Sequence, residues 1–269
     1  MKKFLIITLV IITCAISVAC KKESQKEPAI PPVIVSDANM NGWVKNTQPN
    51  TLGTVKFVNG PSTPPLGKGS VQLASPDMSF VRLRDTTHSG TLLSSLTELS
   101  YSAYVEQRDS TVEMPFIVIL VDADGDGKSE HNLVFDPRFQ TGKYIRGGFP
   151  DQGITKKNVW HTWDALHGVW FFGPFDDQDN GFPPLSLASY TKLYPNATIN
   201  NDASKGGGAI RLTGGGPVFL KNFIGYADNF KIGVKGITTT YDFEQVREIA
   251  VSNRHHNNPN IHFIIKNTL

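Results

Sequence analysis

From Asp37 onward, short runs of β-prone residues are separated by Gly, Pro, Asn and Asp. In residues 80–84 apolar and basic side chains alternate, so one face of a strand would be apolar and the other charged. Residues 116–121 are apolar throughout, which predicts a central strand covered on both faces. This pattern indicates an all-β sandwich of two antiparallel sheets. The predicted strands are residues 42–47, 54–58, 70–74, 80–84, 99–107, 115–121, 131–135, 159–166, 209–212, 218–223 and 227–234.

One segment has the pattern of a short helix. Ser186 is a suitable N-cap for residues 187–194, and Pro195 follows as a stop. We expect this helix to be a surface insertion in a sandwich domain that spans residues 37–244. Residues 245–269 form either a helix and a final strand or a poorly ordered tail.

The N-terminus has a different pattern, with two lysines ahead of an apolar run over residues 4–18. This order is typical of a secretory signal at residues 1–19, and the run is shorter than the roughly 20 residues that a membrane-spanning helix requires. The junction before Cys20 resembles a bacterial lipoprotein signal, which implies lipidation of Cys20 and a flexible tether over residues 20–36. It also implies a location in the cell envelope, on the outer membrane. Plain secretion and a retained anchor are the alternatives.

Cysteine content and charge argue against several classes of function. The only cysteines are Cys14 and Cys20, so the predicted mature domain has no disulfide, cysteine zinc site or cysteine nucleophile. Without its signal the chain carries 24 basic and 24 acidic residues, since two of its 26 lysines and arginines belong to the signal. No basic stripe is present, which argues against a nucleic-acid partner.

An acidic segment directly after the most apolar predicted strand is a candidate metal site. It reads Asp-Ala-Asp-Gly-Asp-Gly-Lys-Ser-Glu over residues 122–130. Carboxylates at alternate positions with glycines between them let several oxygens converge, as calcium requires. Leu133 occupies the twelfth position, so the EF-hand pattern is incomplete. A solvated acidic turn is the alternative. The predicted calcium ligands are Asp122, Asp124, Asp126, the Lys128 carbonyl and Glu130.

An aromatic cluster is a second candidate site. Trp160 and Trp163 have opposite parity, so on a strand one would enter the core and the other face outward. With Trp170 they are candidates to stack on a sugar ring. Packing of these aromatics in the sandwich core is the alternative.

Catalytic signals are weak. No His-Glu-x-x-His segment or Gly-x-Ser-x-Gly elbow occurs. A glycosidase pair could be assembled only from distant carboxylates such as Glu106 and Asp164.

Two segments resemble the jelly rolls of carbohydrate-binding modules, which have a galactose-binding-like fold. Residues 37–44 resemble their opening strand and residues 225–234 their closing strand. Residues 121–127, 160–165 and 239–244 also resemble a domain of uncharacterised secreted bacterial proteins. The first resemblance implies a jelly-roll fold with structural calcium near the first and last strands, where Asp228 would be a ligand.

These observations favour a membrane-anchored lipoprotein that carries a non-catalytic, calcium-stabilised binding module for polysaccharide. A structural or protein-interaction lipoprotein of a cell-surface complex is the first alternative. A glycan-active hydrolase is the second.

Overall fold

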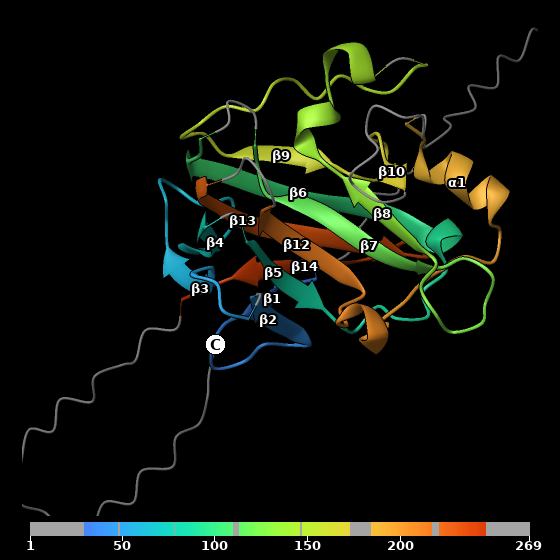
Figure 1. Cartoon of the computed structure of the whole chain (residues 1–269), viewed down its shortest axis with the longest axis horizontal. Helices are drawn as coiled ribbons and strands as arrows, with labels where there is room; N and C mark the ends of the chain where they lie inside the picture. The colour runs from blue at the N-terminus through green and yellow to red at the C-terminus, as the bar shows by residue number, and fades with distance from the viewer. Residues whose placement is uncertain are drawn as a thin grey trace, which may run out of the picture. The chain divides into compact units, whose positions relative to one another are not determined.

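The computed structural model describes residues 30–47, 49–77, 79–109, 113–145, 147–172, 184–216 and 221–245. Over these ranges the chain is all-β, with two sheets and one α-helix (Figure 1). Sheet A contains β1 (Val33–Val35), β14 (Ile237–Phe243), β13 (Lys221–Val234), β4 (Gly69–Asp77) and β3 (Thr54–Asn59), with β6 (Leu96–Gln107) and β9 (His161–Asp164) on the other side of β13. Sheet B contains β10 (Phe171–Phe172), β8 (His131–Phe135), β7 (Phe116–Asp122), β12 (Ile210–Gly215), β5 (Phe80–Asp85) and β2 (Trp43–Thr47), with β11 (Thr198–Ile199) beside β7. Single turns of 3-10 helix connect strands at η1 (Leu93–Ser95), η2 (Pro137–Phe139), η3 (Gly142–Tyr144) and η5 (Ala203–Lys205).

Strand β13 organises sheet A. It pairs with β6 along one side, and on its other side it pairs first with β4 and then with β14. The register with β6 shifts between Asp228 and Lys231. Such irregularities bend a strand and increase its twist, and they lie where β13 exchanges one partner for the next.

The hydrophobic core lies between the two sheets. Trp43 of sheet B meets Phe230, Tyr241 and Phe243 of sheet A edge-on, with ring centroids 5.3–5.4 Å apart. Such edge-to-face contacts add to the stabilisation from burying large apolar side chains. Strand β7 is buried throughout and lies between β8 and β12, as the unbroken apolar run predicts.

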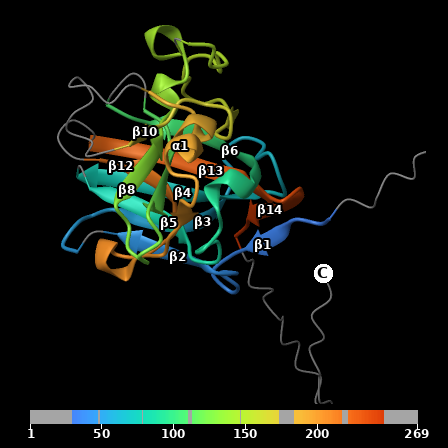
Figure 2. The same cartoon turned by 90° about the vertical axis from the view of Figure 1, so that its right-hand side faces the viewer.

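The predicted helix is confirmed as α1 (Leu187–Leu193). The Ser186 hydroxyl accepts a hydrogen bond from the Ser189 N–H at 3.0 Å, so Ser186 is the N-cap. The helix lies at one edge of the domain near β8 and β10 (Figure 1), and Figure 2 shows that edge face-on. His131 Nδ1 of β8 and the Tyr190 hydroxyl are 2.7 Å apart, which ties the helix to sheet B.

Three sequence predictions need correction. Residues 33–35, assigned to the tether, form β1, which pairs in parallel with β14. The compact unit accordingly begins at Pro31 and not at residue 37. The strands predicted over residues 218–223 and 227–234 are not separate, because residues 221–234 form one strand, β13, while residues 218–220 lie outside the described residues. Strand β14 was not predicted, because its Ile-Thr-Thr-Thr-Tyr-Asp-Phe sequence lacks a clear apolar alternation.

Candidate functional site

The acidic loop, residues 122–130, leaves the end of β7. Four residues, Asp122, Asp124, Asp126 and Glu130, each place one carboxylate oxygen within 4.8 Å of the other three. Asp122 is buried and the other three are exposed. Calcium takes six to eight such oxygen ligands, including those from backbone and water. The loop therefore brings together four of the predicted ligands in a donor set that fits this ion.

Hydrogen bonds within the acidic loop fix its shape without an ion. The two oxygens of Asp122 accept the N–H groups of Gly125 at 2.6 Å and Gly127 at 2.9 Å. Both glycines have positive φ, at 88° and 86°, which explains why glycine occupies these positions. Glu130 accepts the Ala123 N–H at 2.7 Å. A solvated acidic turn would use the same bonds, so both interpretations of the sequence fit this geometry.

The predicted ligand of Lys128 is its carbonyl, and its side chain also enters the acidic loop. Its ammonium lies 3.1 Å from Asp126 Oδ2. The Lys128 N–H, and after it the ammonium, hold the pKa of Asp126 below its ordinary value. The Asp126 carboxylate in turn raises the pKa of Lys128. A cation entering the acidic loop would compete with this ammonium.

Asp202 lies beside the acidic loop, and no sequence signal pointed to it. Its Oδ2 accepts the Ser129 N–H at 3.0 Å, and its Oδ1 accepts the Ser204 hydroxyl at 2.6 Å. These hydrogen bonds, with that from the Ser204 hydroxyl the largest, lower the pKa of Asp202 to about 2. The pairing of β11 with β7, in which Thr198 opposes Asp122, carries the following residues to the loop.

Asp228, the ligand implied by the jelly-roll resemblance, lies elsewhere. It is buried on β13 in sheet A and accepts N–H groups of Leu66 at 2.9 Å and Phe243 at 3.2 Å. Burial raises its pKa to about 7, and the nearby Asp242 carboxylate contributes to the increase. Asp228 is not a member of the acidic loop's oxygen cluster, so the predicted ligands divide between two places.

The three candidate tryptophans also divide. Trp163 and Trp170 are fully buried members of the core. Trp170 Nε1 donates to the Ala165 carbonyl at 2.7 Å, and the Trp163 ring stacks on His161 with centroids 3.8 Å apart. These two rings have no face open to a ligand, which corrects their predicted role. Trp160 is half-exposed and outside the core cluster, as the parity argument requires of one of the pair.

Trp160 belongs to a row of side chains across the outer face of sheet A, which we call the aromatic row. The backbone register places Lys56, Gln72, Tyr226 and Tyr104 opposite one another on successive strands. The Trp160 ring continues the row against Tyr104, with centroids 5.5 Å apart. Its Nε1 donates to a loop carbonyl, that of Pro61, at 3.0 Å, which fixes the ring.

Polar groups along the aromatic row are linked to one another. Gln72 Nε2 donates to the Tyr226 hydroxyl at 2.9 Å, and this hydroxyl donates to Glu106. Burial, followed by the hydrogen bond to Glu106, raises the pKa of Tyr226 to about 12. The hydroxyl therefore stays protonated at neutral pH and can donate continuously.

Glu106 and Asp164 do not form the pair that a glycosidase needs. Asp164 lies opposite Ser100, and Glu106 lies six residues farther along β6. At 3.3 Å per residue these positions are about 20 Å apart. Catalytic carboxyl groups of glycosidases are about 5 to 9.5 Å apart. Asp164 instead lies 2.7 Å from His167 Nδ1.

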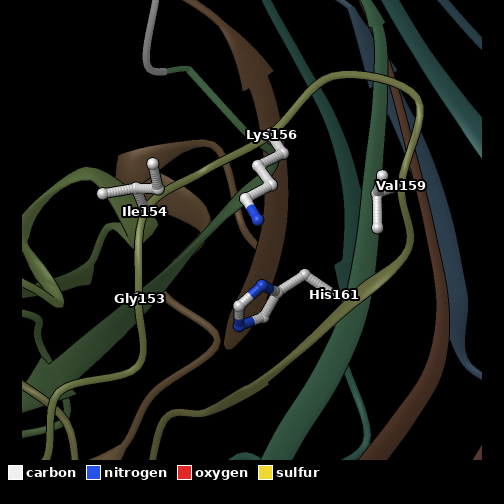
Figure 3. Close-up of a pocket in the computed structure, with 5 residues that line it drawn as sticks. All are labelled: Gly153, Ile154, Lys156, Val159 and His161. Atoms are coloured by element: carbon white, nitrogen blue, oxygen red, sulfur yellow. The ribbon is translucent and has the colours of Figure 1, made fainter.

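A pocket of about 340 Å³ opens beside β9. Figure 3 shows the Lys156 amine and the His161 ring directed into this space, between Ile154 and Val159. Burial lowers the pKa of His161, and the charge of Lys156 also contributes. The His161 ring is therefore neutral at pH 7, and Lys156 supplies the only charge among the side chains that line this pocket.

Comparisons with protein-family models, with curated proteins and with solved structures give no match to this chain. No helix within the described ranges is both long and apolar enough for a membrane crossing. The predicted signal at residues 1–19, Cys20 and the predicted tail at residues 245–269 lie outside the described residues, apart from Gln245 at the start of the tail. Lipidation of Cys20 therefore stays a prediction from the sequence.

Proposed function

We propose that this chain is a lipoprotein of the cell envelope, lipidated at Cys20 and held on the outer membrane. Its β-sandwich would adopt the jelly-roll topology that the resemblance implies and act as a non-catalytic module that binds glycan. Calcium bound at the acidic loop would stiffen the sheet B end of the domain. The observation that carries the glycan assignment is the aromatic row on the outer face of sheet A.

The aromatic row combines the two kinds of group that sugar recognition uses. A fixed, half-exposed indole offers a flat apolar face against which the C–H groups of a sugar ring can pack. Beside it, the amide of Gln72, the hydroxyl of Tyr226 and the carboxylate of Glu106 form a connected set of donors and acceptors. Sugar hydroxyl groups could replace or extend these hydrogen bonds. The exposed Lys56 closes the far end of the row.

Glycan-array screening followed by calorimetry with calcium present tests this assignment. We expect Trp160→Ala to weaken binding of the glycan found by about 5- to 150-fold, taking for a sugar ring the roughly 1–3 kcal/mol that a base gains by stacking on one aromatic ring. Ile237→Ala is the matched control, since Ile237 is an exposed apolar residue at the hairpin between β13 and β14. Unchanged affinity in Trp160→Ala would refute the aromatic row as the site.

The alternative of a protein-interaction lipoprotein makes a different prediction. It requires one stoichiometric partner to co-purify, while no glycan binds in a manner that depends on Trp160. Turnover of a glycan that is abolished by one Asp or Glu substitution would instead establish a hydrolase.

A further inference from the structure

Three arginines gather on the outer face of sheet B, opposite in the sandwich to the face that carries the aromatic row. Arg84 of β5 lies directly opposite Arg211 of β12, and Arg82 follows two residues along β5. The intervening Val81, Leu83 and Leu212 are buried in the core, so the arginines point away from it. Directly opposed like charges destabilise an antiparallel pair. We call this set the arginine cluster.

The arginine cluster has no directly paired carboxylate in the described part of the chain. None of its three members forms an ion pair with a described carboxylate, whereas Arg138 pairs with Asp136 at 2.5 Å. Burial lowers the pKa of Arg82 to about 10, with a further contribution from the charge of Arg84. The pKa of Arg211 falls to about 10 for the same reasons, opposed only weakly by Asp202. Like charges held close together on one half-buried face repel one another, and an anion bound among them would relieve this repulsion.

Two of the three guanidinium groups are already fixed by backbone carbonyls. Arg84 donates to Gly206 and Gly207, and Arg211 Nη2 donates to Lys205 and Gly207 at 2.7 Å. These bonds hold the two charges in place without neutralising them. Arg84 Nε is buried and has no partner among the described residues.

Arg82 differs from the other two members because it donates no hydrogen bond to a backbone carbonyl of the described residues. Its guanidinium lies over the Phe80 ring, 4.7 Å from the centroid, and donates no hydrogen bond within the described ranges. A guanidinium stacked on an aromatic ring keeps its in-plane N–H groups available for bidentate hydrogen bonds to a carboxylate, sulfate or phosphate.

We propose that the arginine cluster is an oxyanion site that binds an acidic glycan through its carboxylate or sulfate groups. The glycan assignment rests on the proposed function, while the oxyanion chemistry rests on the arginines alone. An anionic membrane surface is the less suitable partner. Electrostatic attachment to lipid takes clusters of about 4 to 8 exposed Lys or Arg, and here two of three guanidinium groups are committed to carbonyls.

Calorimetry on the purified full-length protein tests the oxyanion site with three probes: polygalacturonate, chondroitin sulfate and uncharged dextran. We expect at least one acidic glycan to bind, in a salt-sensitive manner, and dextran not to bind at this site. Arg82→Gln should weaken binding by roughly 10- to 100-fold, the loss for a charge-assisted bidentate contact. Arg82→Lys should recover part of the affinity, because it restores the charge without the planar fork.

Lys192→Gln is the matched control, because it removes one exposed positive charge on α1 and should leave the affinity unchanged. Thermal melting of each variant verifies folding. Equal affinity of Arg82→Gln and the natural protein, or binding of anionic vesicles but of neither acidic glycan, would overturn the proposal. Trp160→Ala separates this inference from the proposed function, since the aromatic row lies on the other sheet. Loss in Arg82→Gln alone supports the arginine cluster and refutes the aromatic row; loss in Trp160→Ala alone does the reverse.

Discussion

Glu113 provides a quantitative test of the energetics of this fold. It lies between β6 and β7, is 4% exposed, and its Oε2 is buried with no partner among the described residues. Burial raises its pKa from 4.5 to about 7, although Arg138 and Arg108 favour the charged form. The folded protein therefore retains a proton that the unfolded chain releases, so stability from this group is lost as pH rises from about 4.5 to about 7.

The expected magnitude follows from the pKa difference. A difference of about 2.5 pKa units at 1.36 kcal/mol each gives about 3 kcal/mol as an upper bound on the destabilisation above pH 7. Glu113→Gln places an amide of the same shape as the protonated acid at this site. We therefore expect the variant to match the natural protein near pH 4.5 and to be up to about 3 kcal/mol more stable at pH 8.

Urea unfolding followed by tryptophan fluorescence at several pH values between 4.5 and 8 measures this difference. Asp228 and Asp242, whose pKa values burial raises to about 7 and about 6, titrate in both proteins and cancel in the comparison. Asp37→Asn is the control, because Asp37 is exposed and pairs with Lys45 at the surface. A Glu113→Gln variant that is less stable at pH 8, or a difference independent of pH, would refute the argument.

Two further predictions concern the acidic loop and the core. If calcium binds the acidic loop, a chelator should lower the melting temperature of the natural protein, since ligand at 100 times its Kd contributes about 2.7 kcal/mol. Asp122→Asn, which removes the buried carboxylate of the cluster, should abolish that shift, and a natural protein insensitive to the chelator would contradict calcium binding. Trp43→Ala should lower the free energy of unfolding by about 3–5 kcal/mol, because its ring fills the contact between the sheets. A loss below about 1 kcal/mol by urea unfolding would show that the core closes around the cavity.

The parts of the fold that the sequence predicted well are those with a local physical signature. The alternation in residues 80–84 identifies β5, and the unbroken apolar run before Asp122 identifies β7. In both cases the hydrophobic pattern of the segment itself predicts which of its residues are buried. The N-cap at Ser186 is local in the same sense. Strand β1 was not predicted because its partner β14 lies about 200 residues away in the chain. Strand β14 was not predicted, although it forms a hairpin with β13, because its own sequence lacks a clear apolar alternation. Nothing in the sequence of β1 alone indicates its long-range pairing with β14.

The candidate sites divide in the same way, into one formed by a single segment and two formed by several strands. The acidic loop is a contiguous segment, so its convergence was predictable from spacing. The aromatic row and the arginine cluster arise from strand register, which brings Tyr104 beside Tyr226 and Arg84 beside Arg211. Parity separated Trp160 from Trp163 but did not reveal that Trp170 is also in the core. The alternation of side chains along a strand shows which residues share a face. Only the packing of one sheet against the other decides which face is buried.

The nearly balanced charge of the chain, with 26 basic and 24 acidic residues, conceals a separation of charge within sheet B. The acidic loop follows the end of β7, and the arginine cluster lies on β5 and β12, with β12 the immediate neighbour of β7. Asp202 acts on both, since its carboxylate raises the pKa of Asp126 and also that of Arg211. A cation bound at the acidic loop would offset negative charge near Arg211 and so favour an anion on the arginine cluster. Each ligand, calcium or acidic glycan, would then raise the affinity of sheet B for the other. Neither ligand should change the affinity of the aromatic row, which lies on sheet A.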